Sequence, residues 1–160
     1  MSERPDIGDM IPDIALETTD GGQIKPSDFA GKKLVLFFYP KDATPGCTTE
    51  NKDFSALKAE FDAAGTALLG VSKDPPAKHL KFIEKQELTA PLASDTPVDG
   101  PEGIAEALGI WVEKNMYGRK YMGMERTTYL VGPDGKIAQV WRKVKVKGHA
   151  QAVLEAAQAL

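Results

Sequence analysis

Six consecutive apolar residues at positions 34–39 predict a strand that is buried on both faces. A strand with one face in water alternates apolar and polar residues, and this run shows no such alternation. After the Pro- and Gly-rich segment 40–46, apolar residues recur at spacings of three and four over 54–64. That spacing predicts one amphipathic helix, which Gly65 is placed to end. Because residues 67–71 read as a second buried strand, the first half of the chain predicts a β-α-β unit.

The rest of the chain continues to alternate between strand-like and helix-like segments. Asp74, followed by two prolines, predicts the capped start of another helix. The remaining predicted elements are a hairpin over 14–24 around Asp20-Gly21-Gly22, a short strand at 91–93, a short helix at 102–108, a hairpin of 127–131 with 137–141, and a closing helix at 150–157. This order predicts a single α/β domain over residues 1–160, with a central mixed β-sheet flanked by helices and an N-terminal β-hairpin extension. A thioredoxin-like fold fits the order, as do several other small α/β folds.

Two segments late in the chain have compositions of their own. Residues 116–124 are rich in Met and Tyr and predict a loop, which either rims a substrate pocket, forms a partner interface or packs on the body. Residues 142–147 alternate basic and apolar side chains. That alternation predicts an edge strand with a solvated face, on which lysine discourages pairing with another sheet edge.

Composition excludes several classes of function. The net charge of −3 and the isoelectric point near 5.4 do not favour nucleic acid or an anionic membrane as a partner. The longest apolar run is far too short to span a bilayer, and residues 1–6 lack the basic start and apolar stretch of a secretory signal, which indicates a cytoplasmic protein. The chain has one cysteine, Cys47, and two histidines, His79 and His149, so neither an internal disulfide nor a Cys/His zinc site is expected.

Cys47 follows a buried strand and a turn, at the predicted start of a helix. Thr44 is placed to cap that helix, and Pro45 to occupy its first position. Cys47 then lies in the first turn, near the positive end of the helix dipole and near backbone N–H groups that have no helical partner. These features favour the thiolate form and therefore a reactive cysteine.

Two other cysteine chemistries lack the residues they need. A phosphatase loop requires an arginine six positions after the cysteine, where this chain has Asp53. A papain-like protease requires a histidine held against the thiol, but both histidines are expected to lie exposed on helices. A structural role for Cys47 as a small buried apolar residue stays open at this point.

The residues around Cys47 resemble the active-site motif of the peroxiredoxins. The spacing Pro40-x-x-x-Thr44-x-x-Cys47 matches that motif, and the surrounding segment 38–50 is similar to the peroxiredoxin Q (bacterioferritin comigratory protein) branch. Further segments resemble this branch in the same order, namely 70–74, 91–95, 117–123 and 125–130. The similarity covers nearly the whole chain and implies a thioredoxin fold and a thiol-specific peroxidase that needs no cofactor.

The resemblance assigns a role to each matched residue. Cys47 corresponds to the peroxidatic cysteine, which attacks a hydroperoxide and becomes a sulfenic acid. Arg126 matches the arginine that keeps the thiolate ionised and stabilises charge on the breaking O–O bond. Thr44 is expected to hydrogen-bond the peroxide, and Pro40 to shield the sulfur from water. The backbone N–H groups of Gly46 and Cys47 are expected to complete the cradle for the peroxide oxygens.

Glu50 lies one turn after the cysteine and is grouped with the substrate-binding residues, as a residue that orients Arg126. The chain departs from many members of the branch at Lys52, where they carry a resolving cysteine. An intramolecular disulfide is therefore impossible, and the sulfenic acid must react with an external thiol (glutathione, glutaredoxin or thioredoxin) or with Cys47 of a second subunit. Branch membership implies a monomer or weak homodimer that acts on hydrogen peroxide and organic hydroperoxides in antioxidant defence.

Two other classes of function remain open from the sequence. The missing resolving cysteine is compatible with a peroxide sensor or redox-controlled holdase, in which Cys47 is oxidised without turnover. The third possibility is an inert thioredoxin-fold binding module. The joint presence of Pro40, Thr44, Cys47 and Arg126 argues against it, because such a module has no need of those four residues together.

Overall fold

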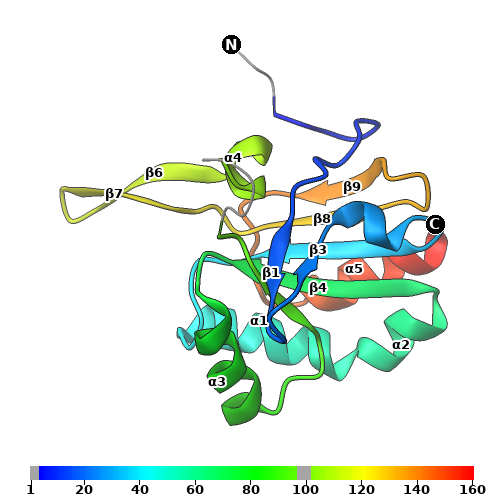
Figure 1. Ribbon diagram of the computed structural model, residues 1–160, viewed down its shortest axis with the longest axis horizontal. Helices are drawn as coiled ribbons and strands as arrows, with labels where there is room; N and C mark the ends of the chain where they lie inside the picture. The colour runs from blue at the N-terminus through cyan, green and yellow to red at the C-terminus, as the bar shows by residue number, and fades with distance from the viewer. Residues whose placement is uncertain (1–3, 97–101) are drawn as a thin grey trace.

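The computed structural model describes residues 4–96 and 102–160 and centres on a seven-stranded mixed sheet (Figure 1). Its strands are, in spatial order, β2 (Gln23–Ile24), β1 (Leu16–Thr18), β5 (Leu92–Ser94), β4 (Thr66–Ser72), β3 (Lys33–Phe38), β8 (Thr127–Val131) and β9 (Ile137–Trp141). β4 pairs in parallel with β3 and β5, whereas the other neighbours pair antiparallel. The predicted α/β class, the mixed sheet and the N-terminal hairpin are confirmed. Residues 1–3 of the segment inspected for a signal lie outside the described residues.

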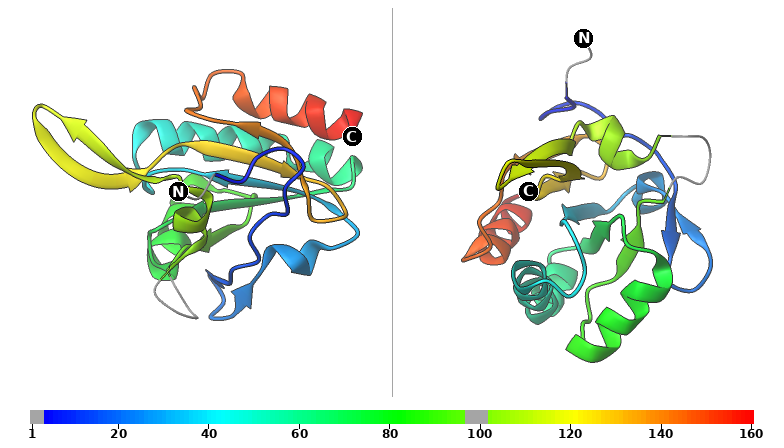
Figure 2. Two further views of the ribbon diagram at one scale, coloured as in Figure 1. Left: turned by 90° about the horizontal axis from the view of Figure 1, so that it is seen from above. Right: turned by 90° about the vertical axis from the view of Figure 1, so that its left-hand side faces the viewer.

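β3 contributes to two separate hydrophobic cores because successive side chains point to opposite faces of the sheet. Leu34, Leu36 and Phe38 pack on the face covered by the short helix α4 and the 3-10 helix η1. Val35 and Phe37 pack on the other face, beneath four helices (Figure 2). The helices are η1 (Pro26–Phe29), α1 (Pro45–Ala56), α2 (Lys58–Ala63), α3 (Pro76–Gln86), α4 (Ile104–Leu108) and α5 (His149–Ala159). The apolar run therefore forms the doubly buried strand that its composition predicts.

The predicted single helix over 54–64 is interrupted. At Leu57 the backbone N–H bonds to the carbonyl of Phe54, three residues back, and this tight turn separates α1 from α2. Gly65 follows α2 with φ of +66°, a left-handed conformation that glycine adopts without steric cost. The prediction of where this helical segment ends is therefore confirmed, whereas the prediction of one continuous helix is wrong.

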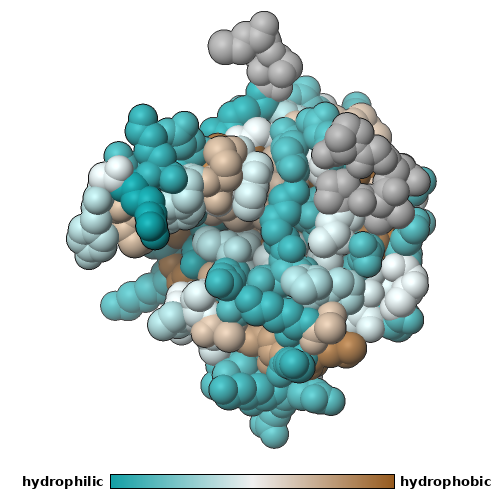
Figure 3. All heavy atoms as spheres, turned by 60° about the vertical axis from the view of Figure 1, so that its left-hand side comes forward, coloured by the Kyte–Doolittle hydropathy of each residue, from teal (hydrophilic) through white to brown (hydrophobic). Residues whose placement is uncertain are grey.

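The segment predicted as a loop, 116–124, belongs instead to a β-hairpin that projects from the body (Figure 1). β6 (Trp111–Met116) and β7 (Arg119–Met124) form this two-stranded sheet, which we call the arm. Tyr117 and Gly118 both have positive φ, as a two-residue type I′ turn requires. The arm escaped prediction because it faces water on most sides and so shows no apolar stripe. Figure 3 shows the molecule with this side forward and a largely hydrophilic surface.

Two further expectations are corrected by the structure. Asp74 does not cap α3, whose N-cap is Pro75, because the Asp74 carboxylate is engaged by other hydrogen bonds. Residues 142–147 do not form an edge strand, since β9 ends at Trp141 and Lys143 adopts a positive φ that breaks the extended chain. Among the described residues, no helix is both long and apolar enough to cross a membrane.

Candidate active site

Cys47 lies in the first turn of α1, directly beyond the end of β3. Thr44 is the N-cap residue and Pro45 the first helical residue, as predicted. Only 1% of Cys47 is exposed, so its thiol is covered by protein. Within the described parts of the chain, the backbone N–H groups of Gly46 and Cys47 have no hydrogen-bond acceptor, because the helical ladder starts with the N–H of Thr48. These two donors and the helix dipole give the sulfur a positive local environment.

Arg126 provides a fixed positive charge at the sulfur. It precedes β8, whose first residue, Thr127, pairs with Phe38 at the end of β3, and this register brings Arg126 to the start of α1. Its Nη2 donates to Cys47 Sγ at 3.3 Å, and its Nη1 donates to Glu50 Oε1 at 2.5 Å. The guanidinium therefore bridges two residues one helical turn apart, a geometry that a lysine ammonium does not reproduce.

Gly46 leaves room for this guanidinium. A Cβ atom at Gly46 lies 3.2 Å from Arg126 Nη2, closer than ordinary van der Waals contact. A side chain at position 46 therefore crowds this guanidinium. The structure thus brings four of the predicted site residues into one cluster, namely Cys47, Arg126, Glu50 and Gly46.

Glu50 is buried next to the cationic group that it binds. Burial raises the pKa of its carboxyl to about 7, against the opposing attraction of Arg126. Its second oxygen, Oε2, has no hydrogen-bond partner among the described residues, which leaves part of the carboxylate charge uncompensated. Near neutral pH this side chain therefore exchanges a proton, and the charge facing Arg126 changes with it.

We expect Glu50→Gln to stabilise the protein at pH values above about 4.5, by an amount that grows until about pH 7. The carboxyl pKa is about 7 in the folded protein and 4.5 ordinarily, so the folded state binds more protons between these values and wild-type stability falls as pH rises. Glutamine does not titrate, so its advantage grows through this window to about 3 kcal/mol at higher pH. Urea unfolding at about pH 4 and about pH 8 measures the difference, because the midpoint reports the change in stability.

Glu60→Gln, on the exposed side of α2, is the matched control and is expected to change stability by less than about 0.5 kcal/mol at either pH. A Glu50→Gln variant that is less stable than the wild type at the higher pH contradicts the assignment of Glu50 as a costly buried carboxylate.

Thr44 and Pro40 lie in the segment that leads from β3 to Cys47. The Thr44 hydroxyl does not cap α1 but donates to the carbonyl of Lys41 at 2.8 Å. Its proton is therefore committed, and its oxygen keeps lone pairs that can accept a hydrogen bond from a bound molecule. Both side chains are partly exposed, in contrast to the buried thiol of Cys47.

Both histidines were predicted to be exposed, and both are buried. His149 packs edge-on against Phe54 and Trp141, and its Nε2 lies 2.8 Å from the Thr128 hydroxyl. Burial, with a smaller contribution from the positive charge of Arg126, lowers the pKa of His149 to about 4, so the ring is neutral at physiological pH. His79 is completely buried, with both ring nitrogens engaged. Its spacing of three from Phe82, on the inner face of α3, is the sequence signal that indicates burial.

Lys114, on β6 of the arm, is a residue near the site that sequence reasoning missed. Burial, then the neighbouring charge of Arg126, lowers the pKa of its ammonium, and its Nζ donates to the Met124 carbonyl at 2.5 Å. Glu113, Lys114 and Arg126 line part of one surface depression at the base of the arm. No local pattern marks Lys114, because only the packing of the arm brings it here.

The comparisons with known proteins agree with this arrangement. Residues 7–140 match the AhpC/TSA family. Peroxiredoxin Bcp of Xanthomonas campestris is 50% identical over 147 residues, which cover 92% of this chain and 89% of the relative. The structure of a Xylella fastidiosa PrxQ mutant has a TM-score of 0.87 at 37% identity, covering 99% of this chain and 98% of the other. A structure from work on the alkyl peroxide reduction activity of Xanthomonas campestris bacterioferritin comigratory protein has a TM-score of 0.83 at 46% identity, covering 94% and 98%.

The chain belongs to the AhpC/TSA family as a peroxiredoxin, a class of thiol peroxidase, and its buried cysteine lies at a helix start against the arginine that precedes β8. Within that class it is similar to the Bcp and PrxQ proteins over nearly all of its length. The thioredoxin-like fold of these structures is thereby confirmed for this chain.

Proposed function

We propose that this chain reduces hydrogen peroxide and organic hydroperoxides with Cys47 alone and is recycled by an external thiol. The contact of 3.3 Å between Arg126 Nη2 and Cys47 Sγ carries the proposal, since it places a permanent cation on the chain's only thiol. The similar Xanthomonas campestris protein with alkyl peroxide reduction activity supports the inclusion of organic hydroperoxides.

In the proposed first step, the Cys47 thiolate attacks the terminal oxygen of the hydroperoxide. An S–O bond forms while the O–O bond breaks, so sulfur is oxidised to a sulfenic acid and the remaining oxygen leaves as hydroxide or alkoxide, which then takes up a proton. Arg126 and the free N–H groups of Gly46 and Cys47 stabilise the charge that develops on the peroxide oxygens. The Thr44 oxygen accepts a hydrogen bond from the peroxide, and Pro40 limits the access of water.

In the proposed second step, an external thiol attacks the sulfenic sulfur, which gives a mixed disulfide and water. A second thiol then attacks the mixed disulfide and restores the Cys47 thiolate. Thioredoxin, glutaredoxin and glutathione are the proposed reductants, because Lys52 stands where many members of the branch carry a resolving cysteine and the sequence has no second cysteine. The reducing cytoplasm, which holds these thiols, is the proposed compartment, and a monomer or weak homodimer is the proposed state.

A peroxide sensor or redox-controlled holdase is the second candidate function. The near-complete burial of Cys47 favours it, because a sulfenic acid in that position is poorly accessible to a bulky reductant. A binding module without chemistry is disfavoured, since neither burial nor folding requires an arginine against the only thiol.

Mass spectrometry separates these functions. We expect reduced protein, mixed with a slight excess of hydrogen peroxide and stopped within seconds, to carry one added oxygen on Cys47. Glutathione, or a thioredoxin or glutaredoxin system, should then return the mass to that of the thiol and sustain turnover. Oxidation without recycling by any of the three indicates the sensor, and a thiol that stays unmodified removes the peroxidase proposal.

A further inference from the structure

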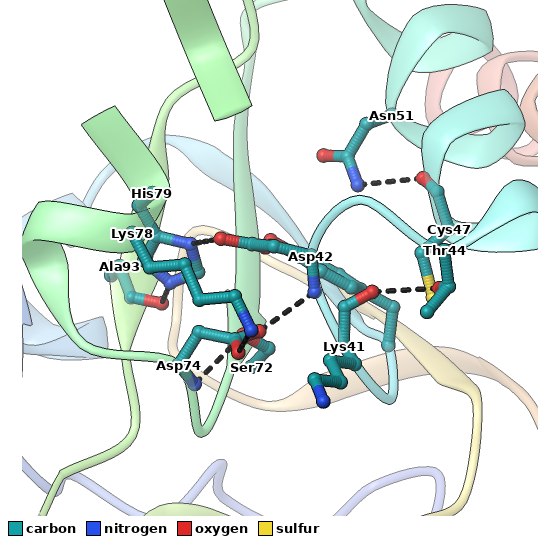
Figure 4. A network of polar contacts seen from close by, with 11 residues as sticks. Lys41, Asp42, Thr44, Cys47, Asn51, Ser72, Asp74, Lys78, His79 and Ala93 are labelled. Atoms are coloured by element: carbon teal, nitrogen blue, oxygen red, sulfur yellow. Dashed lines mark hydrogen bonds and ion pairs between the residues drawn. The ribbon is translucent and has the colours of Figure 1, made fainter. Parts of the chain in front are cut away.

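Asp42 is the centre of a buried polar network beside the active site (Figure 4). One of its carboxylate oxygens accepts a hydrogen bond from the Tyr39 hydroxyl at 2.6 Å, and the other lies 2.6 Å from His79 Nδ1. Its backbone N–H donates to Asp74 Oδ2 at 2.8 Å. Asp74 is held in turn by the Ser72 hydroxyl at 2.7 Å and by Lys78 Nζ at 3.0 Å.

The pair of Asp42 and His79 shares a proton inside the protein. His79 Nε2 lies 3.1 Å from the carbonyl oxygen of Ala93, which can only accept, so this nitrogen carries a proton. The short contact between Nδ1 and Asp42 Oδ2 must also contain a proton, because two bare acceptors would repel each other at this distance. Because neither side chain reaches water, the loss of either partner leaves one polar atom of the other buried without its hydrogen bond.

The network joins elements that meet at one end of the sheet. Tyr39 follows β3, while Ser72 is the last residue of β4 and Ala93 lies in β5. These three strands are parallel neighbours, so their carboxyl ends lie side by side, and His79 reaches this end of the sheet from α3. Asp42 itself belongs to none of these elements. It lies in the segment 40–44, which leads from the end of β3 to the start of α1 and which we call the active-site loop.

The active-site loop needs an anchor because its backbone is strained. Ala43 has φ of +65°, a left-handed conformation that residues other than glycine adopt only at an energetic cost. The Thr44 hydroxyl bonds to Lys41 and so stays within the loop. Among the residues that the structure describes, Asp42 is the one member of the loop whose hydrogen bonds reach Tyr39 just after β3, Asp74 just after β4 and His79 on α3. The residue next to the strained position is thus the one that is tied down.

We propose that Asp42 and His79 are positioning residues that hold the active-site loop closed over Cys47. The anchor keeps Thr44 and the N–H groups of Gly46 and Cys47 in place for peroxide attack. The same anchor opposes the opening that a buried Cys47 sulfenic acid requires before an outside thiol can reach it. The pair therefore favours the oxidation step and slows the recycling step, a consequence that rests on the proposed function.

Asp42→Ala tests the anchor with opposite effects on the two steps. We expect the rate constant for Cys47 oxidation by hydrogen peroxide to fall about tenfold, because the oxygen-binding groups are no longer held in place. We expect the preformed sulfenic acid to react with glutathione about tenfold faster. Losing a hydrogen bond to a charged group destabilises the closed loop by at least about 1.4 kcal/mol, which raises the population of the open loop about tenfold. Hydrogen exchange of the amides over 40–49, followed by mass spectrometry, should accelerate similarly and needs no peroxide.

Asp42→Asn is the conservative variant. Its amide keeps an acceptor for the Tyr39 hydroxyl and a donor for a neutral His79 Nδ1, so oxidation should stay within about threefold of the wild type. If Asp42→Ala fails to fold, Tyr39→Phe is the milder test, because it removes only the hydroxyl that donates to Asp42. It should change hydrogen exchange, Cys47 oxidation and the glutathione reaction in the directions given for Asp42→Ala, each by a few-fold.

Asp95→Ala is the matched control. Asp95 is also a buried carboxylate, but it accepts the N–H groups of Ile104 and Ala105 at the start of α4 and pairs with Lys73 at 3.1 Å, and among the described residues its side chain makes no hydrogen bond to the active-site loop. The Asp95→Ala variant should accelerate hydrogen exchange around α4 and leave the rate of Cys47 oxidation within about twofold of the wild type.

Any of three results overturns the inference. Hydrogen exchange over 40–49 in Asp42→Ala equals that of the wild type, both reaction steps slow together in Asp42→Ala, or the Asp95→Ala variant behaves like Asp42→Ala. If the wild type itself is not oxidised by peroxide, the proposed function fails, and hydrogen exchange still decides whether Asp42 anchors the loop.

Discussion

We expect Cys47→Ser to reduce peroxide consumption to the rate of buffer without protein, while the fold is retained. A serine hydroxyl is not ionised near neutral pH even beside Arg126, and its oxygen cannot be oxidised by a peroxide. Serine has nearly the same shape and can accept the hydrogen bond from Arg126 Nη2, so stability should change by about 1 kcal/mol at most. Peroxide consumption with each thiol system, together with thermal unfolding, measures both effects.

Asp53→Asn, in the same helix and partly exposed, is a suitable control for nonspecific effects of a substitution in α1 and should keep wild-type turnover. Turnover by Cys47→Ser above the buffer rate assigns the chemistry to another group and refutes the proposed mechanism.

The second large effect is expected for Arg126→Ala. We expect oxidation of Cys47 by hydrogen peroxide to slow about a hundredfold, the loss typical of removing one donor that stabilises charge in a transition state. Stopped-flow kinetics of Cys47 oxidation, with thermal unfolding to check the fold, measure this loss.

Arg126→Lys distinguishes charge from geometry. Lysine keeps the charge but cannot donate to Cys47 Sγ and Glu50 Oε1 together, so we expect an intermediate rate. Arg119→Ala, on the exposed surface of β7, is the control and should oxidise at the wild-type rate. Equal rates for Arg126→Ala and the wild type show that the helix start and its free N–H groups suffice to activate the thiol.

The core of the fold and the position of Cys47 were predictable because they depend on neighbouring residues. An unbroken apolar run can only be satisfied by burial on both faces, and β3 is buried in that way. Thr44 and Pro45 start α1 through backbone preferences that act within one turn, so the position of Cys47 at the helix start follows from its neighbouring residues. The role of Arg126, by contrast, came from a resemblance and from no local pattern.

Contacts between distant segments were decided by the tertiary structure. Arg126 reaches Cys47 across 79 positions because β8 pairs with β3 in one register, and a shift of a single residue turns its side chains to the other face. His79 meets Asp42 across 37 positions, which is why a histidine that looks solvated on its own helix is buried. The raised pKa of Glu50 has the same origin, since desolvation depends on everything packed around a carboxyl. The local sequence thus determines which elements form and where in them the Cys47 thiol lies, whereas the charges and hydrogen bonds around the thiol depend on long-range packing.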